Sequence, residues 1–145
     1  MSKSENRTID TLTQLKDAGA ITASAAALVS ASAAIVDLGT GHKFSNIILN
    51  VTAVKVSVGD EQYLICVQGS NSATFASGIQ NLAIFDWSDA AVQSGASDKD
   101  GVVGQAVLPF TNSMDNGNTV YRYLRLYHEI AGTLPSINYV AYAGK

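Results

Sequence analysis

After residue 33 the sequence is a succession of short apolar runs separated by turn signals, and this pattern constrains the fold more than any other feature. Residues 44–58 show it most clearly, because Ile47, Leu49 and Val51 recur at every second position with mostly polar residues between them. A period of two indicates a half-buried β-strand. The other expected strands lie at residues 34–38, 63–68, 79–87, 102–110, 120–130 and 137–142.

The segments between these runs are rich in glycine and small polar residues, which is typical of turns and loops. The longest of them is the polar stretch 88–101. No helix of ordinary length is expected after residue 33. Seven or eight short strands with such connections predict an all-β fold, a β-sandwich or jelly roll, in place of alternating β and α elements.

The N-terminal part of the chain has a different character. Ile9, Leu12 and Leu15 recur at three-residue spacing before Gly19, which is compatible with a short helical turn or with an extended segment. The small residues that follow do not favour a long stable helix. We therefore expect two parts: an N-terminal arm at residues 1–32, partly flexible and with at most a short helix, and a β-sandwich domain at residues 33–145.

Composition limits the partners that the chain can have. Charged residues make up 14% of its 145 residues and the net charge is −3. Low charge suits a surface partly covered by partners, and it equally suits a β-rich domain with a polar, uncharged surface. The basic residues are scattered, so we expect no nucleic-acid binding. The Ala-rich run 18–36 lacks the large apolar residues of a membrane span, so we expect no membrane insertion.

Groups that carry chemistry are few. His42 and His128 are the only histidines, Cys66 is the only cysteine, and no Gly-x-Ser-x-Gly motif occurs. A nucleophilic triad needs a base beside a serine or cysteine and a carboxylate that orients the base. Two distant histidines and one cysteine in an apolar run do not form a zinc site. We therefore expect a protein that is not an enzyme, with no cofactor and no metal site.

Residues 120–130 are the most informative segment. Alternation places tyrosines and an arginine on one face and leucines on the other. Tyrosine and arginine are enriched at protein interfaces, although ordinary cross-strand packing would use the same tyrosines. The apolar residues of the arm are spaced as anchors for a partner. The candidate interface residues are therefore Ile9, Leu12, Leu15, Tyr121, Tyr123, Arg125 and Tyr127.

Three stretches together resemble the small capsid decoration (cement) proteins of tailed bacteriophages. In that family an arm precedes an Asp-Leu-Gly strand, here residues 37–39, and an Arg-Tyr-Leu-Arg strand, here residues 122–125, is followed by a turn of a small residue, Gly and Thr that closes the sheet. Residues 1–8 and 88–101 do not belong to the family pattern. The matching stretches are residues 15–26 running into 35–39, residues 67–70, and residues 121–126 with 130–133 and 141–144.

The resemblance implies a jelly-roll or sandwich fold and no catalysis. It implies a symmetric homo-oligomer, a dimer or trimer, that binds the outer surface of the major capsid protein shell. Such a protein is made in the cytoplasm of the host bacterium and ends on the exterior of the virion, where slight acidity suits a position away from packaged DNA. The alternative is a carbohydrate-binding or host-attachment β-sandwich module of a phage particle, for which Trp87, Ser88 and Asp89 are the candidate sugar-binding residues.

Overall fold

The computed structural model describes residues 9–93, 99–113 and 118–144, and this part of the chain is all-β. Among those residues no helix is long and apolar enough to cross a membrane. Seven strands have seven or more residues and five have two. The strands are β1 (Ile9–Lys16), β2 (Ala20–Ile21), β3 (Ala25–Ala26), β4 (Leu28–Val29), β5 (Ser32–Ala33), β6 (Val36–Asp37), β7 (Phe44–Val54), β8 (Gln62–Ser70), β9 (Gln80–Asp86), β10 (Gly104–Thr111), β11 (Tyr123–Ala131) and β12 (Ile137–Gly144).

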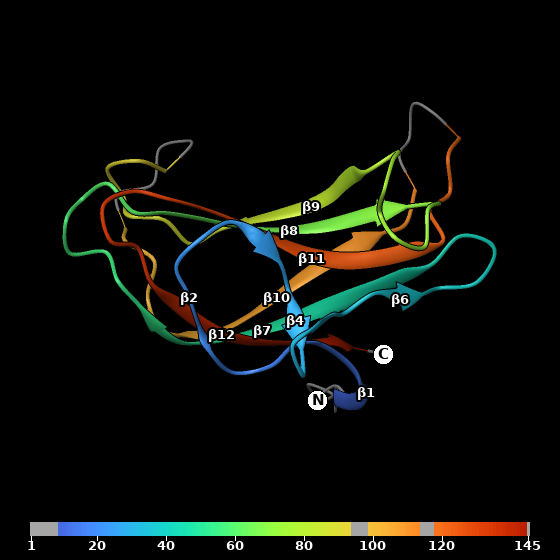
Figure 1. Ribbon diagram of the computed structural model, residues 1–145, viewed down its shortest axis with the longest axis horizontal. Helices are drawn as coiled ribbons and strands as arrows, with labels where there is room; N and C mark the ends of the chain where they lie inside the picture. The colour runs from blue at the N-terminus through green and yellow to red at the C-terminus, as the bar shows by residue number, and fades with distance from the viewer. Residues whose placement is uncertain (1–8, 94–98, 114–117, 145) are drawn as a thin grey trace, which may run out of the picture.

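The long strands form two antiparallel sheets that face each other in two layers (Figure 1). The first sheet has the order β1-β12-β7-β10, and β2 also pairs with β12. The second has the order β3-β11-β8-β9, and β6 also pairs with β11. A small hairpin of β4 and β5 forms a ladder with neither sheet. From β7 onward the chain passes from one sheet to the other after β7, β9, β10 and β11, so neighbours in sequence often lie in opposite layers.

The core lies between the two sheets and follows the alternation of their strands. Ile47, Leu49 and Val51 of β7 are fully buried, as the period of two predicts. The facing sheet contributes Leu124 and Leu126 of β11. Other core residues are Tyr63, Ile65 and Val67 of β8, Phe110 of β10, and Ile137, Tyr139 and Ala141 of β12.

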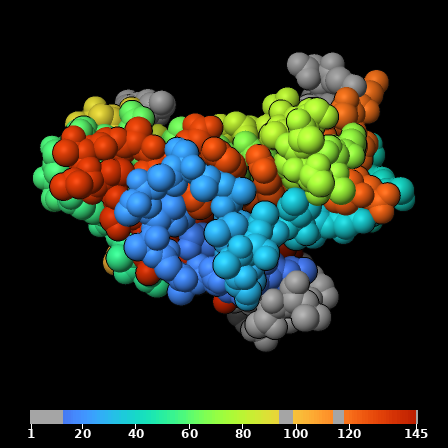
Figure 2. Space-filling model, in the orientation of Figure 1, coloured from blue at the N-terminus to red at the C-terminus, as the bar shows by residue number. Residues whose placement is uncertain are grey.

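The N-terminal segment covers one open side of this sandwich. Figure 2 shows it, in blue and cyan, across the front of the molecule. Here β2 pairs with β12 in one sheet, whereas β3 and β6 pair with β11 in the other. Leu15 and Ala27 are buried in the core, so two residues of the expected arm pack between the layers.

The short helix considered for this segment was wrong, because residues 9–16 form β1 along the edge of β12. Its pairing is interrupted by a register shift between Gln14 and Lys16, where two residues of β1 oppose one step of β12. Such a bulge turns neighbouring side chains to the same side. Leu15 and Lys16 are therefore both buried, and the three-residue apolar spacing belongs to an irregular strand.

The expected strands after residue 43 correspond to β7–β12 within a few residues. The expected strand at residues 34–38 is reduced to the two residues of β6. The difference has a simple cause: β6 pairs only with Tyr123 and Leu124 at the start of β11, and farther along β11 the residues Tyr127 and His128 pair with β3 instead.

Leu15 tests whether the N-terminal segment belongs to the folded core. We expect Leu15→Ala to lower the free energy of unfolding by ~2–5 kcal/mol, because the leucine is fully buried between the sheets. Urea denaturation of the full chain measures this change. Leu134→Ala is the control: Leu134 is 76% exposed, and we expect a change below ~0.5 kcal/mol. Equal stabilities of the two variants would show that the segment is not part of the core.

Candidate interaction surface

The outer face of the second sheet carries the tyrosine and arginine row expected from the sequence. Leu124 and Leu126 point into the core, so Tyr123, Arg125 and Tyr127 point the opposite way, and all three are partly buried. These three residues of β11 are called the β11 row below. The row therefore combines exposure with a packed environment.

Arg125 is held between aromatic rings at the centre of the β11 row. Its guanidinium carbon lies 4.4 Å from the centre of the Phe75 ring and 5.3 Å from that of Tyr127. Arginine stacks well on aromatic faces because its planar cation is attracted by the ring quadrupole. Burial lowers the pKa of Arg125, partly opposed by Tyr127. The side chain is thereby ordered before any partner arrives.

A polar ladder fixes the orientation of this guanidinium. Arg125 Nε donates to Gln68 Oε1 (2.9 Å), and Gln68 Nε2 donates to Asn81 Oδ1 (3.0 Å). The three residues lie opposite one another on β11, β8 and β9. Within the described part of the chain, the Nη atoms of Arg125 have no hydrogen-bond partner. Two terminal nitrogens in a fixed plane can bind a carboxylate in bidentate fashion.

Phe75 completes the site, and the sequence did not point to it. It lies in the loop between β8 and β9, is 5% exposed, and has a positive φ of 54°. Ser70 Oγ and the carbonyl of Ser72 hold the loop through hydrogen bonds to Ser77 O and Phe75 N–H. One aromatic residue in an otherwise small and polar loop is the signal that could have identified it.

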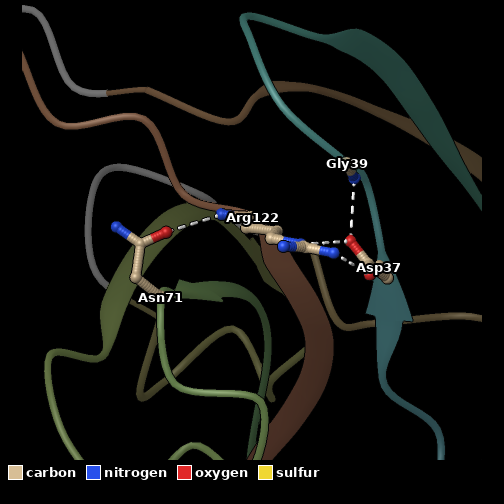
Figure 3. Close-up of polar contacts among 4 residues, drawn as sticks. All are labelled: Asp37, Gly39, Asn71 and Arg122. Atoms are coloured by element: carbon tan, nitrogen blue, oxygen red, sulfur yellow. Dashed lines mark hydrogen bonds and ion pairs between the residues drawn. The ribbon is translucent and has the colours of Figure 1, made fainter.

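A bidentate ion pair anchors the start of β11 (Figure 3). Arg122 donates from Nε and Nη2 to the two carboxylate oxygens of Asp37, both at 2.8 Å. Hydrogen bonds from Arg122 and from the Gly39 N–H hold the pKa of Asp37 at about 2. The Arg122 N–H also donates to Asn71 Oδ1 (2.9 Å), which ties the Phe75 loop to β11. The pair is exposed, so its role is to position Tyr123 and the loop more than to stabilise the fold.

A groove of about 380 Å³ continues the surface beyond Tyr127. It is lined by Tyr127, Glu129, Leu64 and Gln62, together with Ser24 of the N-terminal segment. Ile84 of β9, 51% exposed, lies on the same outer face across β8. An ordered arginine, two tyrosines, an exposed isoleucine and a polar groove form the kind of surface that binds another protein.

The structure does not bring the other candidate residues to this surface. Tyr121 precedes β11, and its N–H donates to Asn112 O (2.8 Å). Its Cβ lies 2.9 Å from where a Cβ on Gly69 would be, beside Leu82 and opposite Leu124. Tyr121 therefore packs toward the core side. Of the arm residues, Leu15 is in the core, whereas the side chains of Ile9 and Leu12 lie outside the described residues.

Among the residues that the structure describes, the chemically reactive groups do not assemble a recognisable catalytic site. Burial raises the pKa of the Cys66 thiol to about 11, which makes it a poor nucleophile. His42 Nδ1 lies 3.2 Å from Ser113 Oγ, but the pair is exposed and no carboxylate of the described residues bonds to this imidazole. Among the same residues no group of three His, Cys, Asp or Glu side chains could hold a metal ion.

The residues proposed for sugar binding lie inside the molecule. Trp87 is 7% exposed, stacks on Phe85 at 4.7 Å between ring centres, and donates from Nε1 to Val102 O (2.6 Å). Ser88 and Asp89 are also buried. Trp87 therefore presents no open aromatic face on which a sugar could stack.

A comparison with protein-family models gave no match, and neither did a comparison with curated protein sequences.

The burial of His128 in its neutral form can be tested through the pH dependence of the free energy of unfolding. It is 3% exposed, and burial together with the charge of Lys16 lowers its pKa to about 4. An unfolded histidine binds its proton near pH 6.5. Between these values the unfolded chain binds more protons, so acid favours unfolding. We expect the free energy of unfolding to fall by on the order of 3 kcal/mol as the pH drops from 6.5 to 4, in addition to carboxylate titration.

The variant His128→Gln should lose this part of the pH dependence of the free energy of unfolding, because glutamine keeps a polar side chain and does not titrate. His42→Gln, which removes the exposed histidine, should retain it. Denaturant unfolding at a series of pH values separates the two variants. A pH profile of His128→Gln that parallels the wild-type profile would show that His128 is not buried in its neutral form.

Proposed function

We propose that this chain is a structural virion protein that decorates and stabilises a phage capsid by binding the outer surface of the major capsid protein shell. The observation that carries the binding role is Arg125, which is stacked between Phe75 and Tyr127 and whose Nη atoms have no hydrogen-bond partner among the described residues. The capsid as the target is carried by the family resemblance of residues 15–39 and 121–144.

The β11 row suits a protein partner for energetic reasons. Binding energy at interfaces is concentrated in a few tyrosine, tryptophan and arginine side chains. Immobilising a flexible side chain costs ~0.5–1.5 kcal/mol, and the stacking of Arg125 removes most of that cost before binding. Its Nη atoms, which no described residue accepts from, favour an acidic group on the shell, so the contact would be a carboxylate set between two tyrosines.

A small contact area per protein is sufficient for decoration because the same contact is repeated over the shell. A shell offers many equivalent sites, and a protein that bridges neighbouring shell subunits gains effective concentration for each further contact. A protein stabilises the shell only if it binds the assembled form better than looser forms. With free protein at about a hundred times its dissociation constant, each site gains roughly 2.7 kcal/mol.

In this role the protein is not an enzyme and needs no cofactor. It lies on the capsid exterior, and its two sheets form a jelly roll of the family type. The net charge of −3 supports a partner other than nucleic acid.

Heating of phage particles tests the stabilising role. We expect particles saturated with this protein to release their DNA at a higher temperature than particles stripped of it. Saturation with Arg125→Gln should require about thirtyfold more protein, because an anchoring arginine contributes on the order of 2 kcal/mol to binding. Lys43→Gln removes one charge from an exposed side chain at the start of β7 and should bind as wild type. Equal release temperatures at verified full occupancy would contradict the stabilising role.

We also propose that the protein forms a symmetric homo-oligomer, a dimer or trimer. Light scattering on the purified full chain at micromolar concentration should give two or three times the chain mass of 15.2 kDa. A protein that stays monomeric at these concentrations and also fails to bind shells would argue against both self-association and decoration.

A further inference from the structure

Residues 17–28 form a closed loop that is fastened to both sheets. The N–H of Asp17 donates to the carbonyl of Leu28 (3.1 Å), so the two ends of the loop meet. One flank pairs with β12 through β2, and on the other flank Ser24 Oγ accepts from the N–H of Ile130 (2.8 Å). Figure 1 shows the chain curving as an open ring from β2 to β4. Compact loops with joined ends are frequently functional.

A pocket of about 230 Å³ lies between this loop and His128 of β11. Its wall is mainly apolar and includes Ala20, Ile21, Ala25 and Leu28. An apolar cavity of ~150 Å³ is large enough for benzene, so this pocket accommodates a compact molecule of about ten non-hydrogen atoms. The ionisable residues that line it are Lys16, Asp17 and His128.

Lys16 brings a buried positive charge to the pocket, and the charge of Asp17 acts on it without a direct ion pair. The side chain is 4% exposed, and its ammonium donates to the carbonyls of Asp17 (2.7 Å), Gly19 (3.1 Å) and Tyr139 (2.9 Å). It also lies 4.7 Å from the centre of the Tyr139 ring. No carboxylate of the described residues forms an ion pair with it; that of Asp17 accepts from the Ser30 N–H. Buried charges are normally paired in direct contact, and Asp17 does not contact this one, so an anion in the adjoining space can pair with it.

His128 supplies a directed donor. The Tyr139 hydroxyl is fully buried and has the imidazole Nδ1 of His128, at 3.2 Å, as its single hydrogen-bond partner in the described residues. The hydroxyl proton therefore goes to Nδ1, and the neutral imidazole carries its own proton on Nε2. No acceptor in the described part of the chain bonds to Nε2, which leaves this N–H for an occupant of the pocket.

These features together select one class of ligand. A cation would be repelled by Lys16, and an apolar molecule without an acceptor would leave the His128 N–H unsatisfied. A dianion would place its second charge against alanine and isoleucine side chains. The group that fits is a single carboxylate on a short aromatic or aliphatic body.

We propose that the pocket beneath residues 17–28 binds a small monocarboxylate, whose carboxylate accepts from His128 Nε2–H beside Lys16 and whose apolar body lies against the loop. This site is distinct from the β11 row, which lies on the opposite, outer face of the second sheet. Occupation would hold the loop between both sheets. Failure of capsid binding would therefore leave the inference untouched.

Benzoate is the probe, with benzamide and benzylamine as neutral and cationic analogues of the same shape. In a ¹⁵N-labelled full chain at pH 7, benzoate should shift the amide resonances of residues 16–28 and of Tyr127 to Glu129. Calorimetry should give a dissociation constant at least ~10-fold lower for benzoate than for benzamide, and benzylamine should produce no heat of binding.

Two variants separate specific binding from surface adsorption. Ala25→Leu fills the pocket and should abolish the benzoate shifts, whereas Ala73→Leu, the same change at an exposed alanine of the Phe75 loop, should retain them. Lys16→Met should erase the preference for benzoate over benzamide. Equal affinity for benzoate and benzamide in the wild type, shifts confined to other residues, or unchanged binding by Ala25→Leu would each overturn the inference.

Discussion

Burial of the inner faces of four central strands is the interaction on which the rest of the structure depends. β7 and β12 in one layer and β8 and β11 in the other place their apolar side chains in a common core. Because side chains alternate along a strand, the same burial decides what remains outside. Leu124 and Leu126 of β11 enter the core, and Tyr123, Arg125 and Tyr127 are left on the outer face as a consequence. The surface proposed for binding is thus the reverse side of the core.

The outer face is made rigid by contacts that the core does not supply. Phe75 reaches over Arg125 from a loop between two strands, and Gln68 and Asn81 complete the ladder across the sheet. An arginine fixed in this way loses little conformational freedom on binding, and its planar donors stay correctly oriented. The exposed pair of Arg122 and Asp37 holds the strand end and the loop in register.

The N-terminal segment covers the open side between the two layers. It crosses that side by pairing briefly with both sheets, and a bulge in β1 turns Leu15 into the core and Lys16 toward Tyr139. Burying an ammonium group is costly unless it is hydrogen-bonded, and three carbonyl oxygens meet that need without neutralising its charge. The buried hydrogen bond between Tyr139 and His128 lies beside it. A segment of mostly small residues therefore covers a pocket whose walls are mainly apolar and whose lining includes Lys16 and His128.

Local pattern alone determined the strands from β7 to β12 and the outward row on β11, because alternation of side chains is a property of neighbours in sequence. It could not determine β1, since a bulge breaks the period of two, and the apolar residues of that segment match a helical turn as well as an irregular strand.

Tertiary structure decided which residues distant in sequence come into contact. Tyr121 shares the parity of the row, but it stands before the strand begins and packs beside Gly69. Phe75 and Arg125 are fifty positions apart, and Lys16, His128 and Tyr139 come from three different strands. Such groups meet only when two sheets close on a shared core, because contacts between distant residues are set by the packing of whole faces, which no local sequence pattern records.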